Sequence, residues 1–134
     1  MASLMPSEAS LDALTASIGK RAEFSGTVGV DDTAIALGSG DVPVLGTPRL
    51  LAWIEQATCR VVDELLPQAW TTVGASVQLD HLAPSRIGDV VLCQAEVSAV
   101  EGRRITFSVS ALTDAQLLAT GTILRLAVQR ARFN

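Results

Sequence analysis

The hydrophobic period of this chain changes once, near residue 70, and that change constrains the fold more than any other feature. Before it, apolar residues between 51 and 65 recur at the three- and four-residue spacing of a helix. After it, apolar and polar residues alternate, first from Thr71 to His81 and then in three later stretches. Each such strand has one face to bury, and the long apolar helix is the obvious cover. The pattern predicts an α+β fold in which an antiparallel sheet wraps around a central helix.

The helix is predicted to start at Thr47-Pro48, with the threonine as N-cap and the proline at the first helical position. Pro67 is expected to stop it. Two short strands are predicted before the helix, at 23–30 and 33–37. Four longer strands are predicted after it, at 71–81, 90–100, 105–111 and 117–128. No linker or repeat divides the chain, so residues 1–134 are predicted to form one domain, with 1–18 as a weakly helical, loosely ordered lead-in.

Composition and charge narrow the class of partner and compartment. Ten basic residues against fourteen acidic ones, with no basic run, argue against nucleic acid as a partner. No apolar run is long enough to span a membrane, and the first residues do not resemble a secretory signal. Cys59 and Cys93 are too few and too far apart for a zinc site and are expected to be free thiols. We expect a cytoplasmic protein without membrane or metal association.

Three residues stand out as candidates for chemistry. His81 is the only histidine in the sequence, and histidine is the residue type whose ordinary pKa lies near neutrality. On the predicted strand it lies on the same face as Val73, Val77 and Leu79. Glu55 lies inside a mostly apolar helix, where a charge needs a partner. A carboxylate beside an imidazole orients the ring, and the start of a helix, here Thr47, offers free N–H groups to an oxyanion. Together they indicate hydrolytic or acyl-group chemistry, against the alternatives of a simple helix cap, a solvated acid and a core histidine.

The segment from residue 44 to 81 resembles the hotdog-fold thioesterases, and most closely the fluoroacetyl-CoA thioesterase group. The resemblance is carried by VLGTP at 44–48, WIEQATC at 53–59 and VGASVQLDH at 73–81, and VEGRR at 100–104 is similar to a hairpin turn of that family. It implies a hotdog fold over about residues 18–134, with Thr47, Glu55 and His81 as the catalytic residues. Gly74 would let substrate approach the backbone. Residues 38–44 lack the aromatic side chains of members specialised for fluoroacetate, so that specificity is not expected.

The resemblance also implies an activity, a substrate and an assembly. The activity is hydrolysis of an acyl-CoA thioester to a free acid and CoA, with no cofactor other than the coenzyme A of the substrate. An acidic protein needs a local basic spot for the CoA phosphates, and Arg86, Arg103 and Arg104 are the candidates. The implied assembly is a homodimer with a continuous sheet, in which Thr47 and Glu55 face His81 of the same or the partner chain.

Two other functions fit the same sequence. An enoyl-thioester hydratase or dehydratase also uses a histidine and an acid in a hotdog fold. A non-catalytic acyl-CoA-binding protein would need neither. The identity of the acyl chain, the choice between CoA and an acyl carrier protein as carrier, and the role of Thr47 as nucleophile or as holder of a water stay open.

Overall fold

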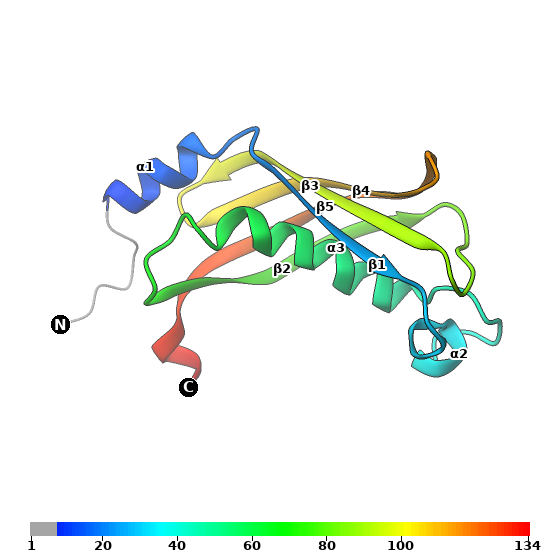
Figure 1. Ribbon diagram of the computed structural model, residues 1–134. Helices are drawn as coiled ribbons and strands as arrows, with labels where there is room; N and C mark the ends of the chain where they lie inside the picture. The colour runs from blue at the N-terminus through cyan, green and yellow to red at the C-terminus, as the bar shows by residue number, and fades with distance from the viewer. Residues whose placement is uncertain (1–7) are drawn as a thin grey trace.

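A five-stranded antiparallel sheet curves around one long helix, as Figure 1 shows. The computed structural model describes residues 8–134. The strand order is β1-β3-β4-β5-β2, so β1 and β2 form the two edges. The strands are β1 (Arg21–Thr27), β2 (Trp70–His81), β3 (Val90–Glu101), β4 (Arg104–Thr113) and β5 (Gln116–Gln129). The helices are α1 (Glu8–Ala16), α2 (Ala34–Leu37) and α3 (Thr47–Val62), with short 3-10 turns η1 (Val30–Asp32) and η2 (Arg130–Phe133).

The core lies between α3 and the concave face of the sheet. Leu50, Ile54 and Ala57 form a fully buried stripe on α3. Alternate residues of the central strands meet that stripe: Val91, Cys93, Ala95 and Val97 on β3, and Ile105, Phe107, Val109 and Ala111 on β4. The intervening residues of these strands are polar or partly exposed. The α+β fold with a sheet wrapped around a central helix is therefore confirmed.

Residues 33–37 are not a strand, and this prediction was wrong. Residues 34–37 form the short helix α2, because the Thr33 hydroxyl accepts a hydrogen bond from the Ala36 N–H at 3.2 Å and caps its start. Gly38, with φ of 70°, ends it in the left-handed conformation. An N-cap threonine followed five residues later by glycine outweighs the alternation that suggested a strand.

The two ends of the chain's best-marked helix also differ slightly from expectation. Gly46, rather than Thr47, occupies the N-cap position of α3, and the helix ends at Val62, five residues before Pro67. Residues 8–16 of the predicted lead-in form α1, and Leu14 is fully buried in the core. The rest of that lead-in, residues 1–7, lies outside the described part of the chain.

A β-bulge in β2 reverses the side-chain alternation within the strand. The pairing register with β5 shifts between Gly74 and Ser76. As a result Thr72 faces the core together with Val77, Leu79 and His81, whereas Val73 turns to the outer face, contrary to the regular alternation read from the sequence. The bulge separates the strand into a part beside Glu55 and a part beside Thr47.

The free edge of β2 exposes apolar surface. No other strand among residues 8–134 pairs with its outer side. Residues 73–78 are all exposed, and the Val77 side chain remains 41% accessible. On its inner side β2 is held close to β5, where a Cβ added at Gly121 would collide with the backbone carbonyl of Gln78. An unpaired edge with apolar side chains is a ready template for pairing with another strand.

Candidate active site

Thr47 and His81 meet at the start of α3. The Thr47 Oγ1 lies 2.8 Å from the His81 Nδ1. The contact follows from how the chain enters the helix: the Leu45 N–H donates to the Ser85 carbonyl at 2.8 Å, which ties the approach to α3 to the segment after β2. Because Gly46 takes the N-cap position, the threonine hydroxyl is not used as a cap. It is free to donate to the imidazole, which is the arrangement that activates a hydroxyl or a bound water.

The first turn of α3 offers one free backbone donor beside this pair. The Gly46 N–H is occupied by the Asp32 carbonyl at 2.9 Å, and Pro48 has no N–H. The structure gives the Thr47 N–H no hydrogen-bond partner. This N–H lies at the N-terminus of a 16-residue helix, where the helix dipole carries partial positive charge. A thioester carbonyl placed there would have its developing negative charge stabilised.

Asp32 holds this turn in place from the other side. Its carboxylate contacts the Arg49 Nε at 2.9 Å and accepts a hydrogen bond from the Gly29 N–H at 2.8 Å. Its backbone carbonyl binds the Gly46 N–H, as described above. One residue therefore fixes the end of β1, the residue before Thr47 and the first turn of α3.

The imidazole of His81 is set up as a base. Burial lowers its pKa from the ordinary value of 6.5, and an interaction with the Ala83 backbone offsets part of that change. The ring is therefore neutral at pH 7, with Nδ1 able to accept the Thr47 proton when Nε2 carries the hydrogen. The Nε2 atom is buried and has no hydrogen-bond partner.

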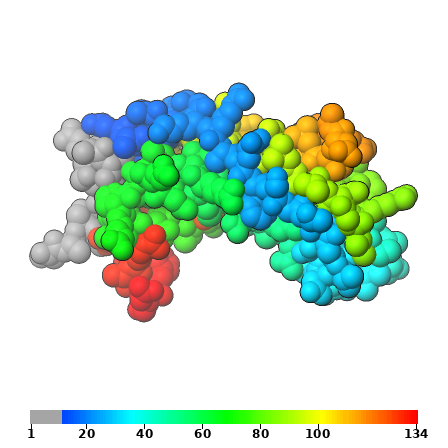
Figure 2. All heavy atoms as spheres, viewed as in Figure 1, coloured from blue at the N-terminus to red at the C-terminus, as the bar shows by residue number. Residues whose placement is uncertain are grey.

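A pocket of about 360 Å³ opens directly beside this pair. Its walls come from α2, the loop at 39–46, Thr47 at the start of α3, His81 at the end of β2, and residues 82–84. Most of these wall residues are small or apolar, and Asp41 is the exception. Figure 2 shows the segment around 30–46 (cyan) at the end of the molecule away from η2 (red). The pocket is the natural place for an acyl group whose carbonyl reaches Thr47.

Glu55 does not meet His81 within one chain. Its Oε2 lies 3.3 Å from the Arg125 guanidinium, and a Cβ added at Gly74 would come within 2.6 Å of the same oxygen. Gly74 precedes His81 by seven residues on β2, a separation of roughly 23 Å at about 3.3 Å per residue. Glu55 nevertheless has a charged partner, as expected for an acid in an apolar helix. Its side chain is 33% exposed, toward the free edge of the sheet.

Arg125 is a site residue that the sequence analysis missed. Arg125 is only 6% exposed. Its guanidinium also donates to the Thr72 hydroxyl at 2.9 Å and to the Thr72 carbonyl at 3.1 Å. A signal was available, because Arg125 falls between Ile123 and Ala127 at the inward parity of β5. A basic residue at a core-facing position calls for a carboxylate partner.

The predicted substrate-binding arginines lie at two different ends of the molecule. Arg86 follows the pocket wall, and its residue pairs with Val44 in an isolated bridge. Arg103 and Arg104 lie at the turn between β3 and β4, at the end of the sheet away from α2 (Figure 1). Gly74 lies at the bulge beside Glu55. The roles of these four residues in binding substrate stay predictions.

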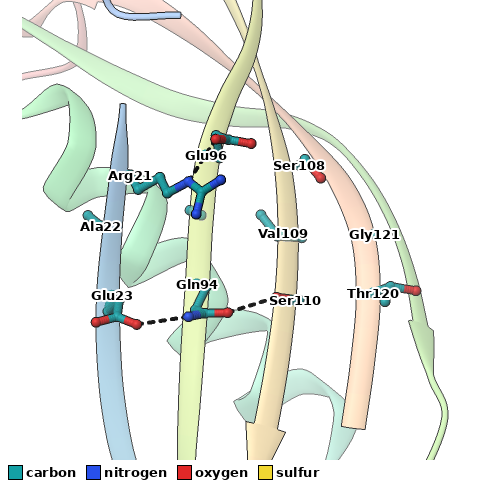
Figure 3. A pocket seen from close by; sticks show the side chains of 11 residues that line it. Arg21, Ala22, Glu23, Gln94, Glu96, Ser108, Val109, Ser110, Thr120 and Gly121 are labelled. Carbon is teal, nitrogen blue, oxygen red and sulfur yellow. Dashed lines mark hydrogen bonds and ion pairs between the residues drawn. The ribbon is translucent and has the colours of Figure 1, made fainter. Parts of the chain in front are cut away.

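A larger hollow, of about 650 Å³, lies elsewhere, on the outer face of the sheet. Figure 3 shows that several of its polar side chains pair with one another. Arg21 binds Glu96 at 2.7 Å, and Gln94 donates to Glu23 at 2.9 Å. It contains no histidine, cysteine or lysine among its lining residues. We therefore place the site at the smaller pocket, which holds the hydroxyl–imidazole pair.

Two other kinds of site find no support in the part of the chain that the structure describes. Residues 8–134 contain no group of three or more potential metal ligands. None of the helices in that range is both long and apolar enough to cross a membrane. Cys59 and Cys93 are free thiols, and burial raises the pKa of Cys93 to about 12, so it is a poor nucleophile.

Comparisons with known proteins agree on one family. Residues 28–131 match the model of the fluoroacetyl-CoA-specific thioesterases. A fluoroacetyl-CoA thioesterase from Streptantibioticus cattleyicolor is 29% identical over 91 residues, which cover 68% of this chain and 66% of that protein, just under two thirds.

Solved structures point the same way. A mutant fluoroacetyl-CoA-specific thioesterase in complex with fluoroacetate and CoA superposes with a TM-score of 0.81 at 26% identity, covering 87% of this chain and 98% of that one. A hot-dog-like protein from Thermanaerovibrio acidaminovorans gives a TM-score of 0.77 at 26% identity, covering 87% of this chain and 93% of that one. The hotdog fold is thereby confirmed.

Proposed function

This chain belongs to the fluoroacetyl-CoA-specific thioesterase family, and we propose that it is an acyl-CoA thioesterase that releases a free acid and CoA. One observation carries the proposal most directly: the Thr47 hydroxyl lies 2.8 Å from the neutral imidazole of His81 at the positive end of α3. That geometry supplies a nucleophile or held water, a base and an oxyanion donor at one point.

In the mechanism, the thioester carbonyl lies beside the Thr47 N–H, with the acyl group in the adjoining pocket. His81 takes a proton from Thr47 or from a water that the threonine holds, and the resulting oxygen nucleophile attacks the carbonyl carbon. The Thr47 N–H stabilises the negative charge that develops on the carbonyl oxygen. The protonated His81 then gives the proton to the departing CoA thiolate. When Thr47 is the nucleophile, a water activated by His81 next hydrolyses the acyl-threonine ester, which releases the free acid and restores the threonine hydroxyl. Accumulation of an acyl-threonine intermediate separates the two routes.

The carboxylate of this mechanism comes from a second copy of the chain. Glu55 lies too far from His81 of its own chain, but it is partly exposed toward the free edge of β2. Two β2 strands that pair antiparallel about a two-fold axis bring different ends of the strand together. An axis near Gln78 places residue 81 of one copy opposite residue 75 of the other, one position from Gly74. Glu55 of the partner then faces the reaction centre, where its charge favours the imidazolium and orients a water.

Three features support pairing through this edge. The strand is 12 residues long, is unpaired on one side and exposes Val77 near the middle. The ion pair with Arg125 holds Glu55 at the edge. The homodimer buries the exposed apolar surface and completes the site in a single step, because neither copy alone has hydroxyl, imidazole and carboxylate together.

The substrate and compartment follow from the same chemistry. Arg86, beside the pocket, and Arg103 and Arg104, at the far end of the sheet, are the predicted contacts for the CoA phosphates. Antiparallel pairing of the two β2 strands would bring the end of the sheet that carries Arg103 and Arg104 in one copy toward the pocket of the other.

Acyl transfer to water at a hydroxyl–imidazole–carboxylate site requires no metal or redox cofactor. Two free thiols suit the reducing cytoplasm, which is where we place the protein.

Release of free thiol tests the proposed activity. Incubated with acyl-CoA esters of increasing chain length and with an aryl-acyl ester, the wild-type protein is expected to liberate CoA from at least one short uncharged member. The absorbance of the conjugated double bond in crotonyl-CoA distinguishes a thioesterase from the rival hydratase. A hydratase removes that absorbance without releasing thiol. Binding without either reaction would instead identify an acyl-CoA-binding protein.

The pH dependence of hydrolysis follows from the lowered pKa of His81. A general base works in its neutral form, which predominates above its pKa, so kcat/KM is expected to rise with pH and to level off. Burial lowers that pKa from 6.5, and the carboxylate of the partner's Glu55 opposes this change, so the midpoint should stay below about pH 7. A pH–rate profile between 4.5 and 8.5 measures it, and a midpoint above 7 would contradict the assigned role.

A further inference from the structure

One charged side chain lines the pocket beside the catalytic pair. Its walls are formed by Ala34, Ser39, Gly40, Asp41, Val42, Val44, Leu45, Gly46, Thr47, His81, Leu82, Ala83 and Pro84. Asp41 is the only residue of this set with a formal charge when His81 is neutral. Asp41 is exposed, and within residues 8–134 its side chain makes no hydrogen bond or ion pair, so its carboxylate is not neutralised by a neighbour.

The backbone around Asp41 is held in place. Ala34 anchors both sides of the loop, because its carbonyl accepts from the Ser39 N–H at 2.9 Å and its N–H donates to the Val44 carbonyl at 2.8 Å. Gly40 also packs against Ala34, where an added Cβ would come within 3.2 Å of the alanine methyl group. Asp41 therefore sits at a defined position on the wall between these anchors.

The nearby cations do not compensate this charge. Arg49 is engaged by Asp32 at 2.9 Å, on the other side of the α3 start. Arg86 follows the pocket wall but is not among the residues that line it. At neutral pH the pocket next to Thr47 thus carries one negative charge and no positive one.

We propose that Asp41 makes this pocket selective for acyl groups without a negative charge, and that it excludes thioesters of dicarboxylic acids. The proposal rests on the thioesterase function above and names its substrate class. A terminal carboxylate on a short acyl chain would lie in the pocket beside the Asp41 carboxylate. Like charges at such separations repel, and the small and apolar walls offer no cation to offset the lost hydration.

Pairs of substrates with equal chain length isolate the charge. Butyryl-CoA and succinyl-CoA both carry four acyl carbons, as propionyl-CoA and malonyl-CoA both carry three. For the wild type, kcat/KM is expected to be at least about tenfold higher for the uncharged member of each pair. Asp41→Asn should shrink that ratio by about fivefold or more, and Asp41→Lys should shrink it further or reverse it. Asp31→Asn, an exposed acid outside the pocket, is the matched control and should keep the wild-type ratio.

Affinity provides a second measurement that does not depend on turnover. Calorimetric titration of butyryl-CoA and succinyl-CoA into His81→Ala, which binds but hardly hydrolyses them, should give the weaker Kd for succinyl-CoA, and adding Asp41→Asn to that variant should narrow the difference. Equal affinity for both members in His81→Ala and equal kcat/KM in the wild type would overturn the proposal, as would a ratio that Asp41→Asn leaves unchanged. Selective binding without thiol release would keep the selectivity and reject the thioesterase function.

Discussion

Replacing His81 with alanine is expected to lower kcat by about 10²- to 10⁴-fold while the fold persists. The loss follows from removing the imidazole that accepts a proton from the Thr47 hydroxyl, 2.8 Å away. An unassisted hydroxyl or water at neutral pH is a poor nucleophile. Steady-state thiol release from the preferred acyl-CoA measures the change. KM should move much less, because the pocket walls and the Thr47 N–H remain.

The folded state should tolerate this substitution. The ring is only partly buried, and its Nε2 is a buried atom without a hydrogen-bond partner, so removing it leaves no new unsatisfied group there. Circular dichroism and the thermal midpoint check that the variant is folded. Asp80→Ala changes the neighbouring residue on the same strand and is the matched control, with near wild-type kcat expected. Near-full turnover by folded His81→Ala would sink the assigned role of the imidazole.

The fold could be predicted because its strongest signals are local and mutually consistent. The apolar spacing in α3 and the alternation in β3, β4 and β5 each specify one buried face. These faces are all buried when the sheet packs against the helix. Residues 33–37 were misassigned because a segment of five residues is too short for periodicity to decide between helix and strand. There the Thr33 cap and Gly38 determine the structure instead.

The bulge at Gly74–Ser76 shows why side-chain directions on β2 were only partly predicted. Strict alternation holds from Val77 to His81, and the inward direction of the histidine was correct. The bulge adds one residue to the strand, so the side chains before it point to the opposite face from the one that regular alternation predicts. The spacing of apolar residues does not indicate where such an extra residue lies. Thr72 and Gly74 consequently face Arg125 and Glu55, where the sequence had suggested otherwise for Thr72.

The candidate site, too, could be predicted only in part from the sequence. Thr47 and His81 belong to segments joined by backbone hydrogen bonds near Leu45 and Ser85, so their proximity is a property of one chain. The partner of Glu55 could not be read from spacing, because Arg125 lies 70 residues away. How Glu55 contributes to catalysis depends on the assembly, which a single sequence does not encode as a local pattern.

Two inactive variants are expected to restore one another if the site is shared between copies. His81→Ala removes the base, and Glu55→Gln removes the catalytic charge while its amide oxygen can still accept from Arg125. A heterodimer of the two then has one site that lacks both groups and one that is intact. Each parent homodimer should retain about 1% of wild-type kcat or less, whereas the heterodimer should recover about half of it.

The most direct test of this account is the thiol-release rate of that heterodimer, isolated with a different affinity tag on each subunit. Single-variant homodimers carrying the same tags are the controls. A rate near half that of the wild type would establish hydrolysis by Thr47 and His81 of one copy with Glu55 of the other. A rate no higher than that of either parent homodimer would contradict the shared site.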